Sequence, residues 1–413
     1  MRSWRNVTVT LATLPAFALA APSIAPIDPP ARSSFDDAQI ARGAALGAIG
    51  NCHDCHTAEG GKPFAGGHAL HTTFGTIYGT NITPDPETGI GRWSLDAFGR
   101  ALREGVGRRG EHLYPVFPYD HFTKLSDNDV AALYAFVMTR DPVRQSTPAN
   151  QVSFPFNVRD FIVVWKNLYF RPGRFLPDPA QGAQWNRGAY LAEGPGHCSA
   201  CHSPRNRLGA EVRERHFAGG SAGTWHAPAL DRSSPSPVPW TADALATYLR
   251  TGLADEHAIA AGPMAPVVHN LRSVGADDVA AIAVYVASWM QGAQLAPAAT
   301  VTIADAQGAA IYASACGECH DKGRTTSSGG ALQLPLAIAL SLPTPANLVH
   351  ITLEGIPPRD GEVSRIMPGF AGSLTDAQVV SLLTYLRADV AHKPAWPDLE
   401  AQVRTIASQG AGD

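Results

Sequence analysis

The chain has 413 residues, only 16% of which are charged, and its formal net charge is −4 at neutral pH. This length predicts two to four domains. The slightly acidic balance lacks the basic signature of a nucleic-acid-binding protein, so we expect no nucleic-acid partner. After the amino-terminal segment, no stretch of the sequence is long and apolar enough to span a bilayer. We therefore expect any membrane association to be peripheral or through a partner.

The first twenty residues have the pattern of a secretory signal peptide. Arg2 and Arg5 precede an apolar run over residues 7–19, and the small residues Ala18 and Ala20 provide a cleavage site. The run is short for a membrane span, although an uncleaved anchor stays an alternative. We expect export of the chain and removal of residues 1–20.

All six cysteines belong to one motif, Cys-x-x-Cys-His, which occurs three times. The copies comprise Cys52, Cys55 and His56; Cys198, Cys201 and His202; and Cys316, Cys319 and His320. This spacing is typical of c-type haem attachment, because each thiol can add to a haem vinyl group and the adjacent histidine can bind the iron. A thioredoxin-like redox pair does not explain the repeated histidine, and a four-ligand zinc site would leave one cysteine pair over. The motif predicts three covalent haems c, with these cysteines as attachment points and these histidines as iron ligands.

Each motif lies in a repeat that has the same helical pattern. A Gly-Ala pair lies in the helix before each motif, at Gly43, Gly188 and Gly308. A later helix in each repeat has a valine followed six residues on by an aromatic residue, and these aromatics are Phe136, Tyr285 and Tyr385. We expect the aromatic residue to pack this last helix against the first one, beside the haem.

The predicted fold is all-α, with three tandem cytochrome c-like domains at residues 36–140, 181–290 and 300–390. Ser126 and Thr375 precede polar residues that resemble helix-capping boxes, and the corresponding helix of the middle repeat starts near Ala276. Small domains of this size bury little apolar surface alone, so we expect the haem to complete each core.

Two further segments flank these repeats. Residues 141–180 form a proline-containing linker with an apolar island at residues 161–170, which either packs against a neighbouring domain or docks a partner protein. Residues 391–413 are expected to form a tail with an extended arm and a short helix.

The sixth iron ligand determines what each haem can do, because methionine raises the potential and closes the site to small molecules. Met264 and Met367 lie next to prolines, in the loop before the last helix of the second and third repeats. We expect both to bind iron on the side opposite the motif histidine. A methionine that only fills a gap in a core is the alternative.

The first repeat has no methionine in this loop. Met264 lies 66 residues after Cys198, whereas the residue 65 positions after Cys52 is Phe117, which cannot bind iron. Either the first haem is five-coordinate or another side chain replaces methionine. We favour His121, four residues further on, with His112 as runner-up and His68 or His71 behind it.

A resemblance to one family covers nearly the whole mature chain, and several short motifs are its most specific parts. They lie at residues 74–78, 80–85, 110–115, 196–198 and 204–206. The sequence is similar to the triple-haem cytochrome c subunits of periplasmic dehydrogenases. The stretch from Phe117 to Phe122, Phe-Pro-Tyr-Asp-His-Phe, most resembles the versions that accompany molybdenum hydroxylases such as nicotinate, isoquinoline or aldehyde dehydrogenases. The short segment after His320 departs from the family pattern and leaves the surroundings of the third haem open.

The resemblance implies an electron-transfer subunit in the periplasm, free or associated with the inner membrane, rather than an enzyme by itself. A catalytic dehydrogenase partner, with molybdopterin and iron–sulfur subunits, would supply electrons, and quinone or another cytochrome would accept them. A quinoprotein alcohol dehydrogenase or a flavin-dependent sugar dehydrogenase is the alternative partner. An alternative function of a different class is that the chain is itself a haem enzyme or a sensor, which would use an open first haem.

Overall fold

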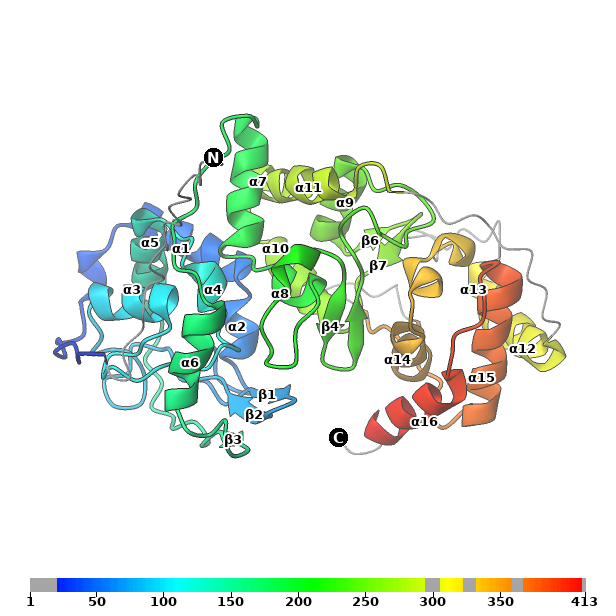
Figure 1. Ribbon diagram of the computed structural model, residues 1–413, viewed down its shortest axis with the longest axis horizontal. Coiled ribbons are helices and arrows are strands. Elements are labelled where there is room, and N and C mark those ends of the chain that lie inside the picture. The colour runs from blue at the N-terminus through cyan, green and yellow to red at the C-terminus, as the bar shows by residue number, and fades with distance from the viewer. Residues whose placement is uncertain (1–20, 294–304, 322–331, 359–366, 411–413) are drawn as a thin grey trace, which may run out of the picture.

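The computed structural model describes residues 21–293, 305–321, 332–358 and 367–410, and the expected signal peptide lies outside them. The described chain is mostly helical, with three small antiparallel sheets. Three helical units follow one another along the longest axis of the molecule (Figure 1). None of the described helices is both long enough and apolar enough to cross a membrane.

The first unit contains five helices and two strands, and a third strand and a sixth helix follow it. They are α1 (Asp37–Ile49), α2 (Cys52–Cys55), β1 (Ala69–Thr72), β2 (Gly75–Tyr78), α3 (Leu95–Glu104), α4 (Tyr119–Phe122), α5 (Asp127–Met138), β3 (Gln151–Val152) and α6 (Asp160–Tyr169). β2 pairs with both β1 and β3.

The second unit repeats this plan. Its elements are α7 (Ala183–Glu193), α8 (Ser199–His202), β4 (Gly220–Ala222), β5 (Trp225–Ala227), α9 (Ala242–Thr251), β6 (Leu253–Ala254), β7 (Ala258–Ile259), α10 (Met264–Leu271) and α11 (Ala276–Met290). β4 pairs with β5, and β6 pairs with β7.

The third unit has fewer elements. They are α12 (Ala306–Ile311), the π-helical turn η3 (Tyr312–Cys316), α13 (Gly317–His320), α14 (Ala346–Glu354), α15 (Asp376–Tyr385) and the π-helical turn η6 (Leu386–Val390), followed by α16 (Leu399–Gly410). Short 3-10 turns lie at Arg32–Ser34, Arg213–Arg215, Leu334–Leu336 and Ile338–Ser341.

The expected contact between the first and last helix of each repeat is confirmed, and a glycine makes it possible. A Cβ atom on Gly43 would lie 1.9 Å from the carbonyl oxygen of Ala132, and one on Gly188 would lie 1.9 Å from that of Ala281. The corresponding distance from Gly308 to the oxygen of Ser381 is 2.2 Å. Only a residue without a side chain lets two helix backbones approach so closely.

The aromatic residue predicted on the last helix lies at the same crossing. The Cβ atoms of Phe136, Tyr285 and Tyr385 would be 2.7, 2.9 and 2.7 Å from a Cβ on the three crossing glycines. The predicted capping boxes are confirmed in part, in full only at Thr375. Ser126 accepts a bond from the Asp129 amide, and Thr375 with Gln378 forms a full capping box, whereas α11 begins at Ala276 without a side-chain cap.

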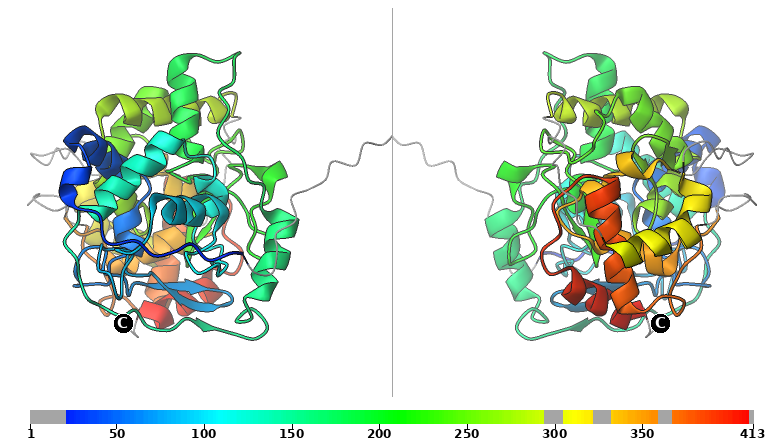
Figure 2. Two further views of the ribbon diagram at one scale, coloured as in Figure 1. Left: turned by 90° about the vertical axis from the view of Figure 1, so that its left-hand side faces the viewer. Right: turned by 90° about the vertical axis from the view of Figure 1, so that its right-hand side faces the viewer.

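The buried apolar side chains form two separate clusters. One cluster runs through both the first and the second unit, from Leu46 and Leu133 to Leu191 and Ile282. The other belongs to the third unit and includes Trp396, from the stretch that the sequence assigns to the tail. α16 packs against α14 and α15 and is seen beside them in the end-on view (Figure 2).

The predicted linker is held against the first unit. β3 extends the β1–β2 hairpin, and α6 buries Ile162 and Val163 while exposing Phe161 and Leu168. Lys166, also on α6, is fully buried and donates to the carbonyl oxygens of Glu104 and Gly105 at the end of α3, at 2.6 and 2.7 Å. This segment is therefore part of the packed structure.

Candidate haem-attachment sites

Each Cys-x-x-Cys-His motif lies on a short helix that follows the first helix of its unit, and its histidine is fixed in one orientation. The Nδ1 atom of His56 lies 2.6 Å from the carbonyl oxygen of Thr80, that of His202 lies 2.7 Å from Pro228, and that of His320 lies 3.2 Å from Leu332. A carbonyl oxygen only accepts hydrogen bonds, so Nδ1 carries the proton and the lone pair of Nε2 is available to a metal.

Burial supports the same role for two of these rings. It lowers the pKa of both His56 and His202, although the bonds to the carbonyls of Thr80 and Pro228 act in the opposite direction. A ring that stays neutral keeps a lone pair for iron, because a protonated imidazole cannot bind a metal.

The six cysteines are free thiols and form no disulfide in the described chain. Burial raises the pKa of Cys52 to about 12, that of Cys55 to about 11 and that of Cys198 to about 12. Reactive redox cysteines and thiolate metal ligands require a lowered pKa. A thioether to haem carries no charge and is compatible with this environment, so the residues present fit haem c.

The first motif is in direct contact with the second unit. Asn270, on α10, donates to the side chain of Asn51 and to Asp54, the latter at 2.8 Å. His197, which precedes Cys198, lies with Nε2 3.2 Å from the carbonyl oxygen of Gly50, just before the first motif. The chain segments that carry the first and second motifs are therefore neighbours.

The loops expected to supply the sixth ligand begin at corresponding glycines with positive φ, namely Gly105, Gly252 and Gly355. Twelve residues later come Phe117 (117 − 105), Met264 (264 − 252) and Met367 (367 − 355). The structure therefore gives the three residues the same place in the chain, counted from the end of a helix.

The three loops differ in which residues form the backbone bridge. In the first unit Val106 pairs with His112, five residues before Phe117 (117 − 112). In the second unit Leu253 pairs with Ile259, five residues before Met264 (264 − 259). In the third unit Ile356 pairs with Met367 itself. The third loop thus keeps the twelve-residue spacing from its glycine, but its backbone bridge lies at the methionine instead of five residues before it.

Phe117 precedes α4, whereas Met264 is the first residue of α10. Both are partly buried against the core that the first two units share. The Phe117 ring meets that of Phe122, with centroids 5.4 Å apart and the planes at 63°. Tyr119 between them is fully buried and turns instead to α6, where its ring meets Phe170 at 5.2 Å.

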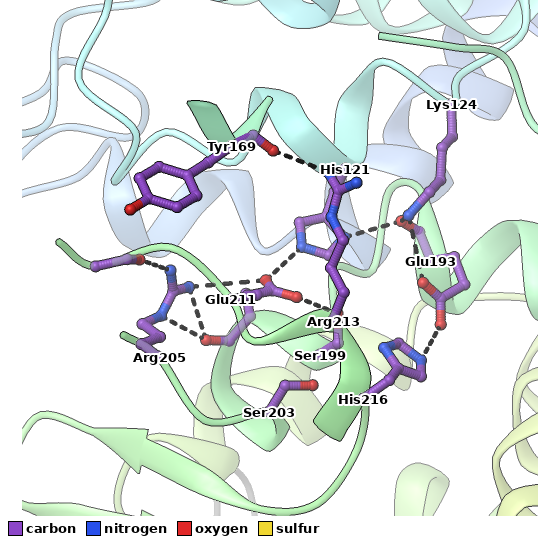
Figure 3. A network of polar contacts seen from close by, with 12 residues as sticks. His121, Lys124, Tyr169, Glu193, Ser199, Ser203, Arg205, Glu211, Arg213 and His216 are labelled. Atoms are coloured by element: carbon purple, nitrogen blue, oxygen red, sulfur yellow. Dashed lines mark hydrogen bonds and ion pairs between the residues drawn. The ribbon is translucent and has the colours of Figure 1, made fainter. Parts of the chain in front are cut away.

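His121 lies in a polar network between the first and second units (Figure 3). Its side chain is 4% exposed, Nδ1 lies 3.0 Å from the carbonyl oxygen of Glu193, and Nε2 lies 2.7 Å from Oε1 of Glu211. Both ring nitrogens are thus engaged by protein acceptors. Iron binding by His121 stays a prediction, and it would require one of these bonds to open.

The other histidines considered for the first iron also have defined places. His112 is buried, with Nδ1 2.9 Å from Nζ of Lys166. His71 is exposed and lies 3.1 Å from the Thr76 hydroxyl. His68 accepts through its carbonyl from the Gly79 amide, next to Thr80, which fixes His56. His68 therefore lies just before β1, beside the segment that fixes the motif histidine.

Comparison with known proteins identifies the family. The chain is 36% identical over 381 residues to the gluconate 2-dehydrogenase cytochrome c subunit of Pantoea cypripedii, which covers 85% of this chain and 86% of that protein. The chain belongs to the family of dehydrogenase cytochrome c subunits. It is also 33% identical over 380 residues to the cytochrome c subunit of the quinone alcohol dehydrogenase of Gluconobacter oxydans, covering 85% of this chain and 78% of the relative.

Two further matches bear on this dehydrogenase cytochrome c subunit. It is 46% identical over 393 residues to a nicotinate dehydrogenase subunit of Pseudomonas putida, which covers 93% of this chain but only 33% of that protein. The chain thus spans about a third of the length of this relative. Residues 304–386 match the family model described as cytochrome c oxidase, cbb3-type, subunit III.

These matches confirm the central prediction from the sequence. The protein is an electron-transfer cytochrome c of this family, and haem c is its cofactor. The chemistry therefore resides in the haem, while the chain sets the ligands, the burial and the spacing.

Sequence patterns did not predict the carboxylates that surround His121. Glu211 also accepts from the Ser199 hydroxyl within the second motif, at 2.9 Å, and Glu193 pairs with Lys124 and His216 (Figure 3). Burial would raise the pKa of both carboxyls, but bonds from His121 and His216 lower the pKa of Glu211 and Glu193 to about 2. No local sequence pattern predicts these pairs, because His121 and Glu211 are 90 residues apart.

Proposed function

We propose that this chain holds three haems c and carries electrons from a periplasmic dehydrogenase of the molybdenum hydroxylase type to quinone or another cytochrome. The observation that carries the proposal is that all three motif histidines donate Nδ1–H to a backbone carbonyl. Such a bond fixes the tautomer and directs Nε2 to a metal. It would be an unexplained coincidence in a protein with fewer haems.

In this proposal each unit is a cytochrome c domain, with boundaries near residues 36–140, 181–290 and 300–390. The cysteine pairs hold the porphyrins, and His56, His202 and His320 bind the irons, which supply one-electron oxidation and reduction. Met264 and Met367 bind the second and third irons and raise their potentials. Residues 1–20 direct the chain to the periplasm and are removed there.

The haem count can be tested on the purified full chain, produced in a host that attaches haem c. We expect the intact mass and the pyridine haemochrome assay to give three haems per chain. Replacing both Cys316→Ala and Cys319→Ala should leave two. A wild-type chain with fewer than three haems would overturn the proposal.

The molybdenum partner is supported by the relative with 46% identity, named as a nicotinate dehydrogenase subunit. The partner can be tested with membranes and periplasm from cells that express the chain, by following reduction of its haems on addition of substrate. Growth on tungstate in place of molybdate inactivates molybdenum enzymes, so substrate-driven reduction should be lost.

A quinoprotein or flavoprotein partner is the second candidate, because relatives named for gluconate and alcohol dehydrogenases match over most of their length. Haem reduction that survives growth on tungstate would favour this candidate. It would leave the electron-transfer role intact and reject only the molybdenum partner.

A further inference from the structure

We infer that the iron of the first haem receives no sixth ligand from its own unit and binds small neutral ligands, such as carbon monoxide in the reduced state. The inference rests on the proposed function, because it needs a haem held by Cys52, Cys55 and His56. It adds a ligand-binding site to a chain otherwise built to carry electrons.

The first argument is the position of Phe117. It stands twelve residues after Gly105, as Met264 and Met367 stand twelve residues after Gly252 and Gly355. Phe117 and Met264 are also both partly buried against the shared core. The first unit therefore keeps the loop that presents a methionine and replaces its sulfur with a hydrocarbon ring, which cannot bind iron.

The second argument is that His121, the histidine nearest to Phe117 in the sequence, is committed elsewhere. Its ring lies between the Glu193 carbonyl and the Glu211 carboxylate, at 3.0 and 2.7 Å. A side chain held at both nitrogens has no free lone pair. Releasing Nε2 would leave the Glu211 carboxyl, only 14% exposed, without this partner, which is costly for a charged group.

The third argument concerns the remaining histidines of the first unit. His68 and His71 belong to the hairpin that runs into Thr80, the residue that fixes His56, so they lie with the proximal support. His53 lies inside the motif and is half-exposed beside Asp54. His112 is buried at the end of α3, where its Nδ1 contacts Lys166 on α6.

The methionines also offer no ligand for the first iron. Met138 is buried on α5, eight residues after Val130, and the residue eight positions after Val279 in the second unit is Ala287 (287 − 279). Met138 thus occupies a packing position, which alanine occupies in the second unit. The parts of the sequence outside the described residues contain no histidine and one methionine, Met1, which belongs to the predicted signal peptide.

The first experiment uses the full-length haem-loaded chain, reduced with dithionite and titrated with carbon monoxide. We expect one carbon monoxide per three haems by the change in the Soret band, and a high-spin ferric signal from one haem in three before reduction. Absence of carbon monoxide binding in a chain that carries three haems overturns this inference and leaves the proposed function standing. A missing first haem would overturn the proposed function instead.

A reciprocal pair of variants locates the open site. Phe117→Met should abolish carbon monoxide binding and remove the high-spin signal, because it restores the sulfur ligand. Met264→Phe should raise binding to two carbon monoxide molecules per chain. If Phe117→Met still binds carbon monoxide while Met264→Phe behaves as expected, the open haem is not the first one and the inference fails.

The His121→Ala variant distinguishes an open first iron from a first iron that His121 binds. We expect one carbon monoxide per chain in both the variant and the wild type, since His121 is held by Glu193 and Glu211. Binding that appears only in the variant would show that His121 closes the site, and would overturn the inference.

Discussion

The first two units and the third unit share one plan but are joined in different ways. The first and second units have a common apolar core, and the His121–Glu211 pair and the Asn270 bonds to the first motif cross between them. The third unit has its own core and meets the second through a few contacts, such as the Asn347 side chain on the backbone of His226. The first and second units thus share one core, whereas the third unit is docked on the second through its surface.

This difference bears on electron transfer, because it decides which of the motifs are held at a fixed spacing. A shared core fixes the spacing of the first and second motifs, because neither unit can move without exposing apolar surface. The contact with the third unit includes the stacked rings of Trp225 and His350, 4.7 Å apart, and the Ile338 amide on the carbonyl oxygen of His257. We expect this junction to open at a lower cost than the first.

The largest expected effect comes from filling the helix crossings. Gly188→Val places a side chain against the Ala281 backbone and should lower the free energy of unfolding by about 3 kcal/mol, at the upper end for overpacking. Because the core is shared, both the first and second units should unfold together at a lower temperature. Gly308→Val should affect only the third unit.

Calorimetry combined with limited proteolysis of the haem-loaded chain would separate these cases. Gly182→Ala is the control, because a Cβ there meets no atom within 4 Å. Independent melting of the first and second units in Gly188→Val would contradict the shared core.

The next effect concerns the polar pair between the first two units. Glu211→Ala removes the acceptor of His121 Nε2 and of the Ser199 hydroxyl, and should destabilise the joined pair by about 2 kcal/mol, the range for an unsatisfied buried group. Exposed Glu214→Ala is the matched control. An unchanged melting temperature in Glu211→Ala would show that the pair does not hold the units together.

The same pair gives a pH dependence with a defined sign. The pKa of Glu211 is lowered to about 2 from 4.5, so its contribution is present above pH 4.5 and is lost as the pH falls toward 2. Burial opposes a charge on His121, but Asp120 and Glu211 raise its pKa above 6.5, so its contribution is present below pH 6.5 and is lost as the pH rises through the higher folded value. Both slopes of stability against pH should become shallower in a His121→Leu, Glu211→Leu double variant, while Glu193, whose pKa is also about 2, keeps part of the acid slope.

The smallest effect is expected at the junction with the third unit. Asn347→Ala removes two bonds to His226, at 2.7 and 2.9 Å, and should cost about 1 kcal/mol. The loss should appear as faster proteolysis between the second and third units, with no change in the melting of the first two. Asn128→Ala, exposed on α5, is the control. Equal destabilisation of all three units would contradict a merely docked third unit.

Local patterns in the sequence predicted a large part of this structure. The three motifs, the glycine and aromatic at each crossing, and the caps at Ser126 and Thr375 depend on near neighbours or on repetition. The domain boundaries and the ligands Met264 and Met367 stay predictions. What the sequence could not give depends on tertiary contacts between distant segments. Examples are Glu211 beside His121, α6 bound through Lys166, and the tail that contributes Trp396 to the third core.

The glycine crossings also bear on the proposed attachment of one haem to each unit. They join residues that are 89 (132 − 43), 93 (281 − 188) and 73 (381 − 308) positions apart, and each motif lies inside the loop so formed. Closing long loops delays folding, because the entropy is lost before the distant contact forms. During synthesis each motif is complete well before the helix that closes over it. The late arrival of that helix would leave a period in which the thiols are accessible to the attachment machinery, before the crossing closes the loop that carries them.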